Sequence, residues 1–476
     1  MRSTFGIGLG TLLVLAAARF ACAQVTLPQV QVPNLPIQTP IDINRTLNGA
    51  LGAANPDQLR ELRRLKIRDL LRTRRTVLEA DPRGAPIVRS EVLALSPTPA
   101  ALDQARAAGF EILRTRTLEG LDMSVVVLRA PERMSTRRAL RQLQRLDPEG
   151  VYDFNHLYLE SGETVVQSPS DEQGQSVSHT TNNATGPSAP PATDKATQSP
   201  ASISTNAGAQ FHAPAATAAG QRPPQARIGL IDGGVDRAHP VFKDIEIQEH
   251  GCPAPTPSAH GTAVASLIAG STADFHGAAP GAALYVADVY CGAATGGALD
   301  AVADAFAWLS REQVPVINVS LVGPANKMLE QIIRAVTARG SVVVAAVGND
   351  GPSAPPLYPA AYPGVIAVTG VDAKKRVLVE ACRGSHVAFA APGADISAAA
   401  LRQTYATVRG TSFAAPIVAG LLALHMQRQD KDGAAAALEL LTTQAVDLGP
   451  RGPDKIYGRG LVGDELRSGI NVASAR

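Results

Sequence analysis

Excess charge of one sign, cysteine and long apolar runs are all scarce in this chain of 476 residues. Lys and Arg number 44 and Asp and Glu number 42, so the formal net charge of +2 gives no support for a nucleic-acid partner. No run of 18 apolar residues occurs, which argues against a membrane-spanning helix. Hydrophobic residues still make up 45%, enough for a large core.

Residues 1–23 have the pattern of a secretory signal peptide. Arg2 precedes an apolar run over 5–18, and Ala21, Cys22 and Ala23 supply the small residues of a cleavage site. A buried amphiphilic helix at the N-terminus is the alternative. We expect the protein to be secreted or periplasmic.

Only Cys252, Cys291 and Cys382 remain once such a signal is removed, so at most one internal disulfide can form. No CxxC pair occurs, and we expect no structural zinc. The spacing alone does not choose the pair. Our preference is Cys252 with Cys291, and three buried free thiols remain the alternative.

Residues 24–89 divide into a proline-rich spacer and a basic helix. Prolines at 28, 33, 36 and 40 indicate an extended segment, whereas 59–77 combines eight Lys and Arg residues with leucines at helical spacing. Such a helix can contact an anionic membrane surface or an acidic partner. The same pattern is typical of a solvated helix face, and both interpretations remain open.

Residues 90–160 predict a small α+β module. Strands are expected at 91–95, 110–116, 124–129 and 151–154, with helices over 99–108 and from Ser135 onward. The order β-α-β-β-α-β is that of a ferredoxin-like fold. Residues 161–226, rich in Ser, Thr, Ala, Pro and Gly, then predict a flexible linker.

Residues 227–476 predict an α/β domain. Short apolar runs alternate with helical segments, and runs that are apolar on both faces are typical of a mostly parallel sheet covered by helices on each side. The expected strands are 228–231, 284–289, 316–319, 342–347 and 365–368.

Three motifs in this domain carry the chemistry. Asp232 ends an apolar strand before two glycines, His260 begins a helix of small residues, and Ser412 precedes an apolar helix in Gly-Thr-Ser-Phe-Ala-Ala-Pro. Taken singly, His260 is more often a structural histidine and Ser412 an N-cap. Together, in this chain order, the motifs resemble those of the subtilisin family of serine peptidases. Further matches occur at 358–368, 391–393 and 457–462.

The resemblance implies a role for each of these side chains. Ser412 is the nucleophile, His260 the base that takes its proton, and Asp232 the carboxylate that holds the imidazole in one tautomer. Asn349, in a segment similar to the family's oxyanion motif, supplies an amide donor beside the Ser412 N–H, although Asn before Asp-Gly is also an ordinary turn residue.

The resemblance also implies a site for an extended peptide, with Ser320, Leu321 and Val322 pairing with the substrate and Gly348 lining the site. Val322 stands where the family generally has glycine, so we expect a narrowed primary specificity pocket. The short loop 271–277 has one carboxylate, and we expect no strong calcium site, no other metal and no cofactor.

These inferences combine into an exported serine endopeptidase made as a self-processing proenzyme. Its substrates are proteins or peptides, and the 90–160 module is similar to a propeptide that assists folding and then plugs the cleft. An unrelated adhesive module is one alternative. Another is a catalytically silent relative in which the module occludes the cleft and the protein acts by binding.

Overall fold

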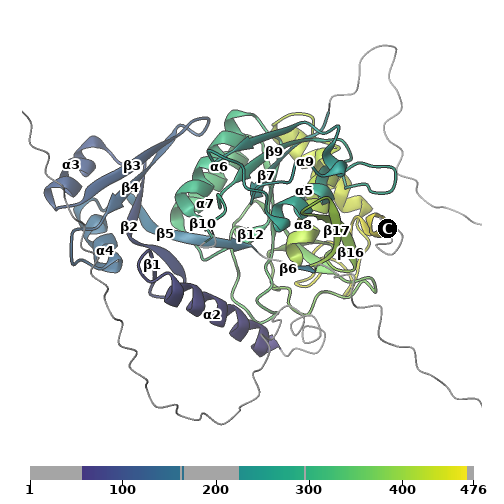
Figure 1. Ribbon diagram of the computed structural model, residues 1–476, viewed down its shortest axis with the longest axis horizontal. Helices are drawn as coiled ribbons and strands as arrows, with labels where there is room; N and C mark the ends of the chain where they lie inside the picture. Colours follow the sequence, from purple (N-terminus) through teal and green to yellow (C-terminus); the bar gives the residue numbers. More distant parts are fainter. Residues whose placement is uncertain (1–55, 161–162, 166–224, 294–295, 469–476) are drawn as a thin grey trace, which may run out of the picture. The chain divides into compact units, whose positions relative to one another are not determined.

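The computed structural model describes residues 56–160, 163–165, 225–293 and 296–468 (Figure 1). The predicted signal peptide, the proline-rich spacer and most of the predicted linker lie outside these residues. Within them, no helix is both long enough and apolar enough to cross a membrane.

The N-terminal module has the predicted β-α-β-β-α-β order. Four strands form an antiparallel sheet in the order β5-β2-β4-β3, and two helices pack on one of its faces. This is the ferredoxin-like arrangement expected from the sequence. The elements are β2 (Pro86–Leu95), α3 (Pro99–Ala107), β3 (Glu111–Leu118), β4 (Met123–Arg129), α4 (Thr136–Leu146) and β5 (Val151–Glu160).

Strand β5 is longer than predicted, because it runs to Glu160 instead of ending at Phe154. Asn155 and His156 break the apolar pattern that marks a strand in the sequence. Both side chains are nevertheless buried, because they hydrogen-bond to Asp300 and Asn326 of the following domain. The extension therefore depends on contacts that local periodicity does not encode.

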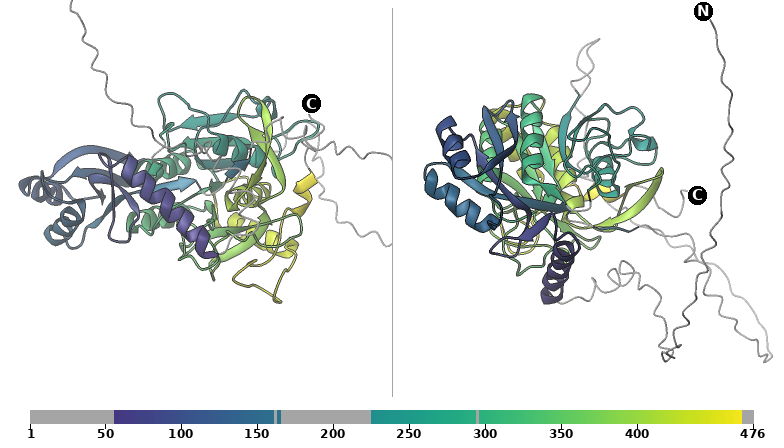
Figure 2. Two further views of the ribbon diagram at one scale, coloured as in Figure 1. Left: turned by 60° about the horizontal axis from the view of Figure 1, so that its bottom comes forward. Right: turned by 60° about the vertical axis from the view of Figure 1, so that its left-hand side comes forward.

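The basic helix α2 (Pro56–Thr73) begins where Asn55-Pro56-Asp57 marks a helix start in the sequence, and it ends four residues before the end of the predicted basic stretch 59–77. A short strand, β1 (Leu78–Ala80), follows it and pairs with β2 at the edge of the module. Figure 2 shows α2 extending from the module alongside the second domain.

The second domain contains the predicted parallel sheet, in the order β15-β14-β13-β11-β7-β9-β8. Its strands are β7 (Arg227–Asp232), β8 (Ile247–His250), β9 (Ala283–Asp288), β11 (Val316–Val319), β13 (Val342–Ala346), β14 (Val365–Val371) and β15 (Val387–Pro392). Four of them are buried at every residue, as expected of a sheet covered on both faces.

Helices cover both faces of the parallel sheet (Figure 1). Alternate side chains of β13 divide between two cores: Val344 packs with α5 and α8, whereas Val343 packs with α6 and α7. The second core also includes apolar residues of the module, so the two parts share one apolar interior. The helices are α5 (Ala259–Ala269), α6 (Leu299–Arg311), α7 (Lys327–Ala338), α8 (Thr411–Ala423) and α9 (Lys431–Gln444).

Several short strands lie outside the parallel sheet. β10 (Gly297–Ala298) and β12 (Leu321–Val322) both pair with β5 of the module. β16 (Ile396–Ala400) pairs with β17 (Thr404–Arg409), and β17 also pairs with β6 (Glu163–Val165). Three residues of the predicted linker thus form a strand. Two short 3-10 helices cover Pro240–Phe242 and Asp464–Ser468.

A disulfide joins Cys252 to Cys291, as preferred from the sequence. Cys382 is a buried free thiol among the described residues. Burial raises the pKa of this thiol to about 12, so it stays protonated at neutral pH.

Candidate active site

Asp232 and His260 form a buried pair at the carboxyl end of β7, an interior strand of the parallel sheet. Asp232 is the last residue of β7, and His260 is the second residue of α5, whose N-cap is Ser258. The imidazole Nδ1 lies 2.9 and 3.0 Å from the two carboxylate oxygens of Asp232. The side chains are 1% and 4% exposed, so the contact is shielded from water.

Asp232 is held in place by its own loop, because the Gly233 backbone N–H donates to Oδ1 over 2.7 Å. With Nδ1 of His260 donating to the carboxylate, the other ring nitrogen is left to act as an acceptor. Nε2 is buried and has no hydrogen-bond partner among the described residues. The arrangement leaves a lone pair at Nε2 for a proton from another group.

Ser412 is the second residue of α8, and the Phe413 ring that follows it lies 5.3 Å from the His260 ring. In this arrangement the Ser412 hydroxyl donates to the Ser320 carbonyl over 3.1 Å, and the Ser320 hydroxyl donates to the Ser412 carbonyl over 3.0 Å. These two bonds attach the start of α8 to the segment that was expected to pair with substrate.

Asn349 lies beside the start of the same helix. Its Oδ1 accepts the Thr411 backbone N–H over 3.1 Å, and the Gly348 N–H donates to the Thr411 hydroxyl over 3.1 Å. Because Oδ1 accepts this bond, the orientation of the Asn349 amide group is determined and Nδ2 is its donor side. The sequence-predicted residues 232, 260, 349 and 412 are therefore brought into one region.

Three nearby charges act on the pKa of His260. Burial alone lowers it, but the Asp232 carboxylate raises it through charge and hydrogen bonding, and Glu160 raises it further, whereas Lys66 lowers it. The net effect places the pKa above its ordinary value. In this state the imidazole holds a proton to a higher pH than a free histidine does.

Strand β5 of the module lies in the region expected to bind substrate. It pairs antiparallel with β10 on one side, Gly297 facing Tyr158, and with β12 on the other, Leu321 facing Glu160 and Val322 facing Leu159. An extended segment between two short strands uses backbone hydrogen bonds, as a bound peptide does. Of the predicted pairing residues, Leu321 and Val322 make this contact.

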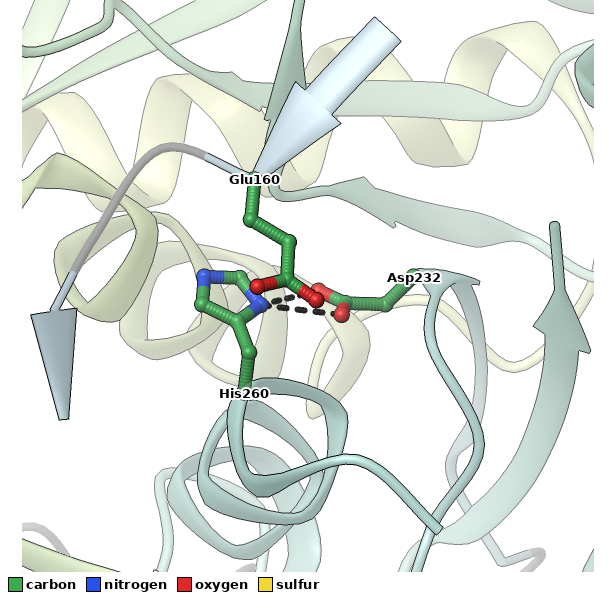
Figure 3. Close-up of side chains that lie close together, drawn as sticks. All are labelled: Glu160, Asp232 and His260. Carbon is green, nitrogen blue, oxygen red and sulfur yellow. Dashed lines mark hydrogen bonds and ion pairs between the residues drawn. The ribbon is translucent and has the colours of Figure 1, made fainter. Parts of the chain in front are cut away.

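Glu160, the last residue of β5, points at the Asp232–His260 pair (Figure 3). One ligand atom from each of the three side chains lies within 4.8 Å of the others. This geometry is compatible with a cation, but Nδ1 of His260 is already bonded to Asp232. We therefore assign no metal site here.

Comparison with known proteins identifies the second domain. The model of the subtilase family matches residues 225–460. Subtilisin DY of Bacillus licheniformis is 31% identical over 261 residues, which cover 52% of this chain and 92% of that protein. The chain belongs to the subtilase family. It is a subtilisin-like serine peptidase, as the three motifs indicated.

Two other similar proteins are matched over a smaller share of their own length. The minor extracellular protease Epr of Bacillus subtilis (strain 168) is 34% identical over 206 residues, 43% of this chain and 32% of that protein. The chain therefore spans about a third of the length of Epr. Fervidolysin of Fervidobacterium pennivorans, described as a keratinolytic enzyme related to subtilisin, matches with a TM-score of 0.57 at 20% identity, over 80% of this chain and 61% of that one. This last likeness shows the shared fold alone.

Sequence reasoning missed the residues of the subtilase that receive β5. The Tyr158 side chain is fully buried, and its hydroxyl donates to the Pro324 carbonyl over 3.0 Å. A Cβ at Gly323 would lie 2.6 Å from the Tyr158 ring, so the absence of a side chain there makes room for it. The glycine after Val322 was the available signal, but its partner lies in another domain.

A buried polar network joins the module to α6. Asp300, in the first turn of α6, accepts from Arg114 over 2.9 Å and from Asn155 over 3.0 Å, and Arg114 also binds both oxygens of Glu91. Burial raises the pKa of Asp300, but Arg114, Asn155 and Arg116 together outweigh this and hold the pKa below its ordinary value. The carboxylate therefore stays charged when the module is docked.

Helix α2 also contacts the subtilase domain. Arg63 Nε lies 2.9 Å from Asp350 Oδ2, with the two side chains 19% and 15% exposed. Asp350 directly follows Asn349, so this ion pair lies next to the predicted oxyanion donor. Lys66, one turn further along α2, lines a pocket with Glu160.

Proposed function

We propose that this subtilase is an exported endopeptidase that cleaves protein or peptide substrates through Asp232, His260 and Ser412. The observation that carries the proposal is the buried Asp232–His260 pair, whose free Nε2 adjoins the helix that begins at Thr411. No cofactor enters the mechanism, and no nucleic acid is proposed as a partner.

In the acylation step, rotation about the Cα–Cβ bond of Ser412 turns its hydroxyl from Ser320 toward Nε2 of His260. The oxygen attacks the carbonyl carbon of the peptide bond while Nε2 accepts the proton, and Asp232 stabilises the imidazolium. His260 then gives that proton to the leaving amine. Water, deprotonated by His260, hydrolyses the acyl-enzyme and restores Ser412.

The negative charge on the attacked carbonyl oxygen needs donors that are already in place. We assign this role to Nδ2 of Asn349 and to the Ser412 N–H at the start of α8. The bond from Thr411 N–H to Asn349 Oδ1 supports this assignment, because it fixes which side of the amide group carries the N–H donors.

We further propose that the module is a propeptide and an intramolecular inhibitor. Strand β5 ends at Glu160 beside His260, and the chain resumes as β6 paired with β17, the strand that leads to Ser412. A substrate that crosses the site takes such a path. The bond that is cut in self-processing is therefore assigned to the segment between Glu160 and Glu163.

Helix α2 has a part in this inhibition. The Arg63–Asp350 pair favours docking of α2 on the peptidase over contact of the same helix with an anionic membrane. Membrane contact through 59–77 remains a separate prediction. Pelleting of the protein with anionic vesicles in a salt-sensitive manner would support it.

The alternative function is a silent binding protein whose cleft stays occluded by the module. Purified precursor that reacts with a fluorophosphonate and shortens to a peptidase fragment would exclude this alternative. Ser412→Ala should lose both properties, because it removes the nucleophile and lowers turnover by several orders of magnitude. Ser353→Ala, which removes an exposed serine, serves as the matched control.

Continued shortening of purified Ser412→Ala precursor would overturn the proposed mechanism. Mass spectrometry of the mature N-terminus from culture fluid would test export at the same time. It would also locate the processed bond relative to Glu160.

A further inference from the structure

A pocket of about 270 Å³ lies beside Glu160, at the boundary between the module and the peptidase domain. It is lined by Lys66 and Glu160 from the N-terminal part, and by Gly234, Ser258, Asp288 and Tyr290 from the peptidase. None of the proposed catalytic steps uses Asp288. Its position in this pocket raises the question of what its charge serves.

Asp288 is the last residue of β9 and stands opposite Asp232 in the register of the parallel sheet. Its Oδ1 accepts the backbone N–H groups of Tyr290 and Cys291, both over 2.9 Å. Its Oδ2 is buried and has no hydrogen-bond partner among the described residues. The residue as a whole is 6% exposed. A buried carboxylate oxygen without a partner is costly, and a hydrogen-bond donor placed beside it relieves that cost.

The wall of the pocket has no side chain in front of Oδ2 at Gly234. A Cβ at Gly234 would lie 3.2 Å from Oδ2 and 2.4 Å from the Thr256 carbonyl oxygen. Glycine at this position therefore keeps the space in front of the carboxylate open. The disulfide from Cys291 to Cys252 ties the loop that holds Oδ1 to a neighbouring segment.

The charges around the pocket favour a cation. Asp232, Asp288 and Glu160 are acidic, and Lys66 is the basic residue that lines it. Burial raises the pKa of Glu160, and the Asp232 and Asp288 carboxylates raise it further, whereas His260 and Lys66 oppose the rise. A negatively charged side chain is thus unfavourable at this position. In the precursor, the positive charge of Lys66 partly offsets the repulsion between Glu160 and the two aspartates.

We propose that Asp288 makes this pocket a subsite for a basic side chain of the substrate. The ammonium group of Lys or the guanidinium group of Arg, at the position that Glu160 holds in the precursor, hydrogen-bonds to Oδ2 of Asp288. The inference rests on the proposed endopeptidase function and specifies its substrate class. In the precursor, Lys66 supplies the positive charge in place of the substrate.

The test uses the full chain after self-processing. The mapped processing site first tells how many residues before the cut bond Glu160 stands. Synthetic peptides that are identical except for Lys, Arg, Ala or Glu at that position are then compared by kcat/KM. We expect Lys and Arg to exceed Ala on the order of tenfold, as for one charge-assisted hydrogen bond, with Glu the poorest.

Asp288→Asn tests the residue itself. The change keeps Oδ1 for Tyr290 and Cys291 and removes only the charge, so the ratio of kcat/KM for Lys over Ala should fall to near one. Asp244→Asn, at an exposed aspartate with no role in the pocket, should keep the wild-type ratio. A wild-type enzyme that cuts the Lys, Ala and Glu peptides equally would overturn the inference, even if Asp288→Asn fails to fold.

The two proposals fail in different ways. Hydrolysis of all peptides at equal rates, with normal fluorophosphonate labelling, would reject only the basic subsite. Absence of both labelling and hydrolysis would reject the endopeptidase function itself. An Asp288→Asn enzyme that kept the full preference for Lys would place the subsite on another carboxylate and overturn the assignment to Asp288.

Discussion

The carboxylate of Glu160 lies beside the imidazole of His260, although one residue belongs to the N-terminal module and the other to the peptidase domain (Figure 3). The contact places the end of a module strand next to the base that would act on it. Its charge favours the protonated imidazole. The precursor therefore hinders the deprotonation that its own processing requires.

This relationship predicts a pH effect on self-processing. His260 must lose its proton to act as a base, so the rate should rise with pH through its raised pKa. Glu160→Gln removes a charge that raises this pKa, and the rise should then occur at lower pH. Gel analysis of processing of purified precursor between about pH 5 and 9 measures the shift.

Lys66→Gln supplies the opposite change. Lys66 lowers the pKa of His260, so its removal should move the rise in processing to higher pH. Identical pH profiles for both variants and the wild type would mean that neither charge acts on the base. A merely structural role would change the rate at all pH values without moving the midpoint.

Asn349→Ala should lower kcat by about 10² to 10³-fold, because an oxyanion donor acts mainly in the transition state. KM for a small peptide should change little, since the ground-state carbonyl needs this donor less. Steady-state kinetics of the processed enzyme measure both constants. A raised KM with unchanged kcat would mean that substrate binding is weakened as much as transition-state binding. That result would assign Asn349 to substrate binding instead.

Gly323→Ala should weaken docking of the module. The new Cβ would meet the Tyr158 ring at 2.6 Å, and such overpacking lowers the free energy of unfolding by about 1–3 kcal/mol. The precursor should unfold at a lower temperature in a thermal melt. Combining the change with Tyr158→Val should restore part of the loss, and strict additivity of the two changes would contradict the contact.

Arg63→Ala should release the module sooner after processing. The Arg63–Asp350 pair is partly buried, and its loss should cost about 1 kcal/mol, or roughly fivefold in the rate of fluorophosphonate labelling. Arg64→Ala is the matched control, because Arg64 is 63% exposed and pairs only with Glu61 of its own helix among the described residues. Equal effects of both variants would point to general loss of positive charge.

The local patterns that predicted the strands and motifs of the peptidase domain were correct, because they depend on each segment's immediate surroundings. Val316–Val319 coincides with its predicted strand, since a run that is apolar on both faces needs a sheet covered on both sides. Asp232, His260 and Ser412 were recognisable because each stands where an element begins or ends, within a distinctive set of small residues.

The same patterns did not predict the contacts between the module and the peptidase domain. Strand β5 was expected to stop at Phe154, because Asn155 and His156 are polar and their partners, Asp300 and Asn326, come much later in the chain. The basic helix was equally ambiguous. Only docking showed that Arg63 of this helix reaches Asp350.

The amino-acid sequence by itself thus determined the family, the parallel sheet, the module's order of elements and the identity of the candidate catalytic residues. Tertiary structure alone decided that β5 lies between β10 and β12 and that Glu160 stands beside His260. It also decided that one oxygen of Asp288, beside a pocket, has no hydrogen-bond partner in the part of the chain that the structure describes. Periodicity and motifs encode what a segment needs from its immediate surroundings. Which distant segment meets that need depends on how the folded parts pack together, and no local pattern contains that information.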